Sequence, residues 1–61
     1  MENKIKNRRE ELGMLLTELA VKSNLSVGYI CHLEKGTRKN PSTKAIQKIA
    51  KALNTTVDSL I

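Results

Sequence analysis

Hydrophobic residues recur along this chain at helical spacing, and no stretch shows the strict alternation of a half-buried strand. The clearest series is Ile46, Ile49, Ala50 and Leu53, which follows the i, i+3, i+4, i+7 order of an amphipathic helix. Polar capping residues and glycines divide the chain into five such segments. The pattern predicts an all-α fold, and the length of 61 residues predicts one small domain over residues 1–61.

Capping signals place the ends of these helices. Residues whose side chains can accept a hydrogen bond from the first helical turn precede four segments: Asn3, Ser26, Ser42 and Thr56. Residues that tolerate a left-handed backbone follow three segments: Gly13, Gly36 and Asn54. The first helix is expected to turn Ile5 and Leu12 inward. The second, which includes residues 18–20, is expected to run to about Ser23.

The second and third predicted helices are joined very tightly. Only Asn24 and Leu25 separate the end of one from the Ser26 cap of the other. Leu25 just before the cap and Ile30 four residues into the helix match the spacing of a hydrophobic staple, which fixes the entry angle of the chain. Two short helices joined in this way cross steeply, so the spacing predicts a helix-turn-helix.

The third predicted helix, residues 26–35, has two different sides. At 100° per residue, Leu33 and Glu34 fall within about 60° of Ile30 and face the core. The other residues lie opposite or on the flanks: Gly28, His32 and Lys35 opposite, Tyr29 and Cys31 on the flanks. The exposed side begins at a helix N-terminus, where a phosphate near Ser26 would be favoured.

The exposed residues suit contact with nucleic acid. His32 can hydrogen-bond a base edge, and Lys35 can reach a phosphate or a guanine. Gly28 would let the helix backbone approach another surface closely, and Tyr29 can contact a sugar, a thymine methyl or a phosphate. Simple tolerance of Gly28, an idle surface His32 and burial of Tyr29 against the second helix remain open alternatives.

Glu34 is an acidic residue on the core side of this helix. A buried lone charge is costly, and Arg8 and Arg9 of the first helix are both candidate partners. We interpret Glu34 as structural, and the alternative is a solvated glutamate at the end of a helix.

The charge balance points to an anionic partner. Eleven basic residues face six acidic ones, for a net charge of +5. Residues 35–57 contain no acidic residue and six basic ones: Lys35, Arg38, Lys39, Lys44, Lys48 and Lys51. A one-sided positive field favours a polyanion. A lysine-rich surface that serves only solubility is the alternative.

Other classes of protein are disfavoured. One cysteine, Cys31, and one histidine cannot form a disulfide or complete a tetrahedral zinc site, so no metal or other cofactor is expected. Cys31 and His32 point about 100° apart on a helix and form no nucleophile–base pair, so no enzyme is expected. The apolar run at residues 14–16 is far short of the roughly 20 residues of a membrane span. A lone thiol and a charged N-terminus without a signal peptide favour the cytoplasm.

The run LGMLLTELAVKSNLSVGYICHLEKGTRKNPS resembles the lambda-repressor-like, Cro-type helix-turn-helix domain of the XRE family. The resemblance covers nearly the whole chain. It includes Arg9 before residues 12–13, Leu33-Glu34 before Gly36, and the tail at residues 56–60. It implies a compact five-helix bundle whose third helix lies in the DNA major groove.

The resemblance also implies roles for single residues. The base-reading positions correspond to Val27, Gly28, Tyr29 and His32. The positions that clamp the DNA backbone correspond to Ser26, Lys35, Arg38, Lys39 and Asn40. An ion pair between the first and third helices corresponds to Arg9 and Glu34.

The chain departs from the family where the second helix begins. Many members have a polar cap and a DNA-contacting glutamine at the positions of Leu15 and Leu16, and neither leucine can serve there unless Thr17 caps a shortened helix. Val27 and Gly28 offer no side-chain hydrogen bonds either. Base selection would then rest on His32, Tyr29, apolar contact from Val27 and groove shape.

These observations predict a sequence-specific DNA-binding transcriptional regulator, a repressor, with no small-molecule substrate. One recognition helix covers few base pairs, so a homodimer on a palindromic operator is expected. Val57, Leu60 and Ile61 either form the dimer surface or merely close the core. The alternative function is a protein-interaction or antitoxin-type module with the same fold.

Overall fold

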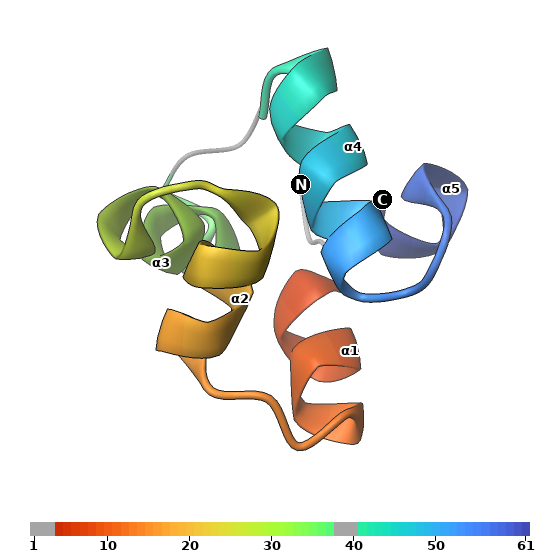
Figure 1. Cartoon of the computed structure of the whole chain (residues 1–61). Coiled ribbons are helices and arrows are strands. Elements are labelled where there is room, and N and C mark those ends of the chain that lie inside the picture. Colours follow the sequence, from red (N-terminus) through yellow and green to blue (C-terminus); the bar gives the residue numbers. More distant parts are fainter. Residues whose placement is uncertain (1–3, 38–40) are drawn as a thin grey trace.

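The structure, a computed structural model, describes residues 4–37 and 41–61 (Figure 1). These ranges contain five helices: α1 (Ile5–Glu11), α2 (Leu16–Ser23), α3 (Val27–Lys35), α4 (Thr43–Ala52) and α5 (Val57–Leu60). No strand occurs in the described ranges, so the all-α prediction is confirmed. No helix in them is long and apolar enough to cross a lipid bilayer.

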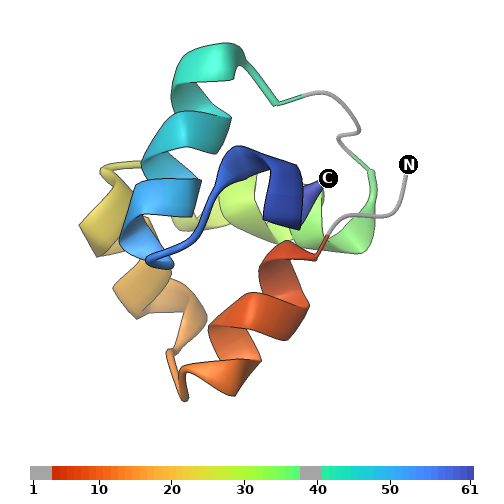
Figure 2. The same cartoon turned by 90° about the vertical axis from the view of Figure 1, so that its right-hand side faces the viewer.

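Each helix contributes at least one buried apolar side chain to a shared core. The fully buried members are Ile5, Leu19, Ile30, Leu33, Ile49, Leu53 and Leu60. Helix α2 packs against α3 and α4, α1 packs against α3, and α5 packs against α4 (Figures 1 and 2). The Lys4 N–H donates to the Leu60 carbonyl oxygen at 2.9 Å and joins the start of α1 to the end of α5.

The predicted N-caps of α3, α4 and α5 are confirmed. Ser26, Ser42 and Thr56 each accept a hydrogen bond from the backbone N–H three residues later, at 3.1, 3.1 and 3.3 Å. Gly13, Gly36 and Asn54 have φ values of 64°, 79° and 53°, in the left-handed region. Asn3, the predicted cap of the first helix, lies outside the described residues.

The start of α2 corrects one expectation. Leu15 holds the N-cap position without a side-chain hydrogen bond, and its N–H donates to Glu18 Oε1 at 2.9 Å. This contact is the second half of a capping box and satisfies one backbone group at the helix start. The helix therefore begins at Leu16, and Thr17 is not its cap.

Leu12 also differs from its predicted place in the core. Helix α1 ends at Glu11, and the backbone of the next residues turns through the left-handed Gly13. Leu12 consequently lies outside, with 43% of its surface exposed, and Met14 enters the core from the same turn. The prediction for Leu12 was wrong because it extended the helical periodicity past the end of α1.

The connection between α2 and α3 is the predicted tight turn. Asn24 adopts a left-handed backbone with φ of 57°, and the Leu25 N–H donates to the Ala20 carbonyl oxygen at 3.0 Å. Ser23 is buried, and its hydroxyl donates to the Leu19 carbonyl oxygen at 2.7 Å. These short contacts end α2 and turn the chain into α3 without leaving the buried hydroxyl unpaired.

An ion pair sets the rotation of α3 about its own axis. Arg9 of α1 donates to both carboxylate oxygens of Glu34, Nε to Oε2 at 2.8 Å and Nη2 to Oε1 at 3.1 Å. Only 13% and 7% of the two side chains are exposed. The remaining Arg9 nitrogen, Nη1, donates to the Met14 carbonyl oxygen at 2.8 Å.

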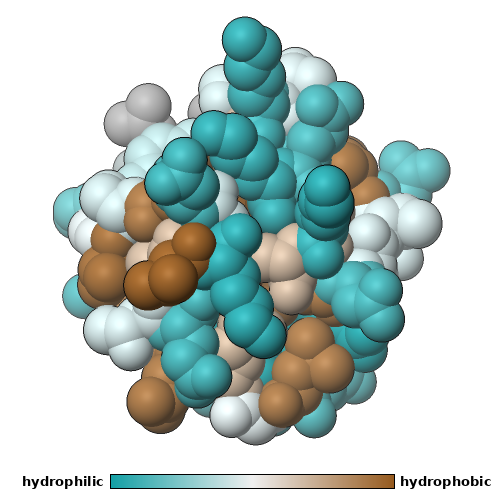
Figure 3. Space-filling view, in the orientation of Figure 1, coloured by the Kyte–Doolittle hydropathy of each residue, from teal (hydrophilic) through white to brown (hydrophobic). Residues whose placement is uncertain are grey.

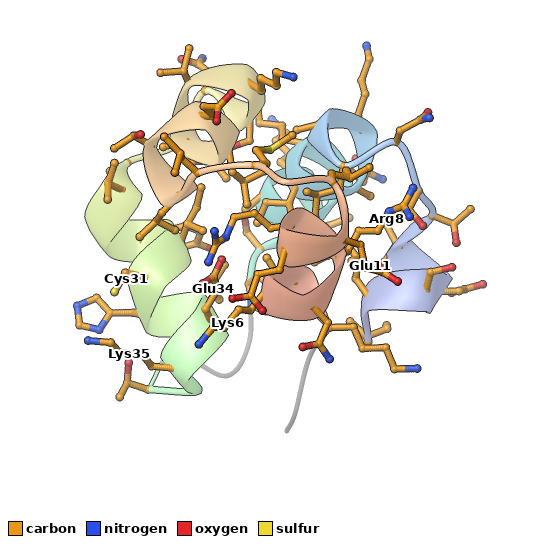
Figure 4. All side chains as sticks on the ribbon, turned by 90° about the horizontal axis from the view of Figure 1, so that it is seen from below. Lys6, Arg8, Glu11, Cys31, Glu34 and Lys35 are labelled. Atoms are coloured by element: carbon orange, nitrogen blue, oxygen red, sulfur yellow. The ribbon has the colours of Figure 1, made fainter. Side chains whose placement is uncertain are left out.

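The same hydrogen bond to Glu34 raises the pKa of the Arg9 guanidinium above its ordinary value, against the opposing effect of burial. Figure 4 shows Glu34 on the side of α3 that faces α1, whereas Cys31 and Lys35 project away from α1. The neighbouring Arg8 is used elsewhere, because its Nε donates to the Leu53 carbonyl oxygen at 3.1 Å.

We expect Glu34→Ala to lower the free energy of unfolding by about 2–3 kcal/mol, because it leaves the half-buried Arg9 charge without its carboxylate. Chemical denaturation of the two proteins measures the difference. Glu11→Ala is the matched control: that carboxylate is exposed and lies 3.8 Å from Arg8. It is expected to change stability by less than about 0.5 kcal/mol. Equal effects of the two substitutions would contradict a structural role for Glu34.

Candidate nucleic-acid interface

The outer side of α3 is free of contacts with the core. Gly28, His32 and Lys35 are exposed along it, while Ile30 and Leu33 are buried on the other side. Ser26 and Val27 are exposed at the N-terminal end, where the Ser26 side chain is occupied by its cap hydrogen bond. The structure therefore gathers most of the predicted contact residues on one accessible surface.

Gly28 is helical, and no contact with the described residues requires it to be glycine. A Cβ built at this position meets no atom within 4 Å, and Gly28 does not have a positive φ. Glycine inside a helix costs about 0.5–1 kcal/mol relative to alanine. The monomer thus carries this cost without a steric or conformational reason of its own.

Tyr29 is partly buried against the core rather than fully exposed. Its hydroxyl oxygen accepts a hydrogen bond from the Ser42 N–H at 3.4 Å, at the start of α4. The expectation of burial against the second helix therefore missed this partner. Tyr29 therefore joins α3, the helix predicted to contact DNA, to the N-terminus of α4.

His32 is exposed, and its ring contacts Thr37, just beyond the end of α3. The distance from His32 Nδ1 to Thr37 Oγ1 is 2.9 Å. Sequence reasoning missed Thr37. The sequence does place a hydroxyl residue directly after Gly36, which ends the helix. A side chain at that position can fold back onto the last helical turn, so the contact could have been predicted.

Four exposed lysines lie on α3 and α4. Lys35 is exposed at the end of α3, and three more lysines are exposed along α4: Lys44, Lys48 and Lys51. The predicted backbone contacts Arg38, Lys39 and Asn40 lie outside the described residues. Of these four lysines only Lys35 belongs to α3, whereas Lys48 and Lys51 line a hollow together with the end of α2.

A shallow hollow borders α3 on the side of α2. It is lined by residues of both helices and their turn: Thr17, Ala20, Val21, Asn24, Leu25, Ser26 and Val27. Figure 3 shows apolar side chains on this face of the molecule, on the side where Figure 1 places α2 and α3. Leu15 is 64% exposed, and Leu16 packs on the core. Both side chains are apolar, so neither can donate a hydrogen bond to an anion.

Comparison with known proteins gives a consistent result. A family model described as helix-turn-helix matches residues 5–60. The HTH-type transcriptional regulator SinR of Bacillus subtilis is 33% identical over 58 residues, which are 95% of this chain and 52% of SinR. The HTH-type transcriptional regulator DdrOP3 of Deinococcus deserti is 34% identical over 58 residues, 95% of this chain and 44% of that protein.

A solved structure also matches. The N-terminal DNA-binding domain of SinR from Bacillus subtilis superimposes with a TM-score of 0.88 and 32% identity, covering 92% of this chain and 81% of that chain. The present chain spans about half the length of the curated relatives it matches. The likeness therefore concerns one domain of those proteins.

We expect Gly28→Ala to raise the free energy of unfolding by about 0.5–1 kcal/mol, because the added methyl group enters open space on a helix. Thermal unfolding followed by circular dichroism measures the change. Gly36→Ala is the matched control, since its added methyl also meets nothing within 4 Å but its φ is 79°. That variant is expected to be less stable than the parent protein, by about 1 kcal/mol or more. A destabilised Gly28→Ala would show that the fold itself needs the glycine.

Proposed function

Because the chain belongs to the helix-turn-helix family, we propose that it binds double-stranded DNA as a transcriptional regulator, with α3 in the major groove. The single observation that carries the proposal is the outer side of α3, along which Gly28, His32 and Lys35 are all exposed. The helix has nine residues, which is long enough to lie in a groove of the duplex. An α-helix fits the major groove, where each base pair presents a distinct pattern of donors and acceptors.

The proposed contacts with DNA are of two kinds, to the phosphates and to the bases. Lys35 and the predicted backbone residues Ser26, Arg38, Lys39 and Asn40 hold the phosphates, which supply most of the affinity. Val27, Gly28, Tyr29 and His32 face the bases. Tyr29 also packs on the core and accepts a hydrogen bond from the Ser42 N–H, which holds α3 against the start of α4.

We further propose that the protein acts as a repressor and binds as a homodimer to a palindromic operator. One helix of nine residues contacts few base pairs, so a second copy is needed for a selective site. Leu60 is buried within the monomer, whereas Ile61 is 54% exposed beside the half-buried Val57. A contact between copies would therefore use Ile61 and Val57.

Selection of binding sites from random duplexes tests this function directly. Recovery of a two-fold symmetric site supports the homodimer, and an asymmetric site contradicts it. Absence of binding to any DNA at low salt would contradict DNA recognition altogether and favour the protein-interaction module. That second function is supported by Val21, an apolar side chain 80% exposed beside the hollow between α2 and α3.

We expect Lys35→Ala to reduce the slope of log affinity against log salt concentration by about one unit, because one phosphate contact is lost. Binding to a random-sequence duplex at several salt concentrations measures the slope. Lys51→Ala removes the same charge from the last turn of α4 and is expected to change the slope less. Equal slopes for all three proteins would remove Lys35 from the phosphate contacts.

Gly28→Ala is expected to weaken binding to the selected site by about 1 kcal/mol or more, because a methyl group would stand between α3 and the groove. The same substitution is expected to stabilise the free protein, so a loss of binding cannot come from unfolding. Fluorescence anisotropy with the selected duplex measures the affinity. Unchanged affinity would mean that the helix backbone does not approach the DNA closely at Gly28.

A further inference from the structure

Thr37 contacts His32 at two points. Its Oγ1 lies 3.1 Å from the His32 carbonyl oxygen and 2.9 Å from the ring nitrogen Nδ1. A hydroxyl has one hydrogen, and a carbonyl oxygen can only accept. If the hydroxyl hydrogen points to the carbonyl oxygen, then Nδ1 must carry a hydrogen and donate it to Oγ1. Both hydrogen bonds then form.

The other arrangement is worse. An unprotonated Nδ1 would accept the hydrogen of the Thr37 hydroxyl. The hydroxyl oxygen of Thr37 and the carbonyl oxygen of His32 would then face each other at 3.1 Å with no hydrogen between them. One hydrogen bond would be lost, and the carbonyl of His32 would lose its partner. That carbonyl belongs to the last turn of α3, where carbonyl oxygens have no helical N–H ahead of them. The contacts therefore favour the tautomer with hydrogen on Nδ1.

This tautomer decides what His32 offers to a ligand. In a neutral imidazole with hydrogen on Nδ1, the other nitrogen, Nε2, is an acceptor. Nδ1 is occupied by Thr37, so Nε2 is the polar atom of the ring that remains available. His32 is exposed on the same side of α3 as Gly28 and Lys35. The outer side of α3 thus carries an oriented acceptor.

Building on the proposed function, we propose that Nε2 of His32 accepts a hydrogen bond from the amino group of an adenine or a cytosine, and that Thr37 is the positioning residue that imposes this choice. In the major groove, adenine N6 and cytosine N4 are the donors, whereas guanine O6 and N7 and thymine O4 are acceptors. A bare nitrogen facing a keto oxygen gains no hydrogen bond. One hydrogen bond corresponds to about a fivefold difference in affinity.

The tautomer can be measured without DNA. His32 is the only histidine in the chain, so its ring nitrogens give unambiguous signals in a long-range ¹H–¹⁵N correlation spectrum, recorded at a pH where the ring is neutral. We expect Nδ1 to show the shift of a protonated nitrogen and Nε2 that of a bare one. Thr37→Val is expected to shift the ring toward the Nε2-protonated form, and Thr37→Ser, which keeps the hydroxyl, is expected to preserve the original signals. A protonated Nε2 in the unaltered protein overturns the proposal.

The base contact is tested atom by atom. The base pair contacted by His32 is the one whose preference disappears in a site selection with His32→Ala. In duplexes where the amino group of its adenine or cytosine is replaced by hydrogen, we expect affinity to fall about fivefold. Removal of the purine N7 at the same pair is expected to have no effect, because a bare nitrogen cannot donate to it.

The variants complete the test. His32→Ala is expected to be insensitive to loss of the amino group, Thr37→Val to be less sensitive than the unaltered protein, and Thr37→Ser to regain the full effect. Sensitivity to N7 rather than to the amino group would overturn the proposal, as would a His32→Ala variant with unchanged selection. Failure of the unaltered protein to bind any DNA overturns the base contact together with the proposed function. The spectrum reports the tautomer separately.

Discussion

The guanidinium of Arg9 joins α1, the turn before α2, and α3. It holds both oxygens of Glu34 on α3 and the carbonyl oxygen of Met14 in the turn before α2, while its own backbone belongs to α1. A domain of this size buries a limited apolar surface, so bidentate polar contacts weigh heavily in setting its geometry. Because Glu34 is held inward, the opposite side of α3 must face outward.

That outward side is not optimised for the stability of the monomer. Gly28 occupies an open helical position where alanine would be better, and Val27 exposes an apolar side chain at the helix start. Residues that break a local rule without a compensating contact in the fold indicate a surface selected for something else. The close approach of α3 to DNA that we propose would account for both residues.

Hydrogen bonds hold α3 at its two ends and join it to the start of α4. Ser26 caps the start, the Tyr29 hydroxyl accepts from the Ser42 N–H at the start of α4, and Thr37 binds the carbonyl and the ring of His32 at the end. A contact surface whose side chains are already oriented loses less entropy when it binds. The selectivity proposed for His32 is an example, because its acceptor is fixed before any base is met.

The sequence by itself determined the five helices of the described residues and the N-caps of α3, α4 and α5, because Ser26, Ser42 and Thr56 act on N–H groups only three residues away. Helical periodicity also separated the buried from the exposed side of α3. Only the tertiary structure decided which distant groups meet. Residue reasoning left Arg8 and Arg9 open as partners of Glu34, 25 positions from Arg9, and it missed the contact of Tyr29 with Ser42. It also predicted that Leu12 is buried, because it extended the helical periodicity past the end of α1. Such contacts depend on how helices are placed in space, which local pattern and propensity do not specify.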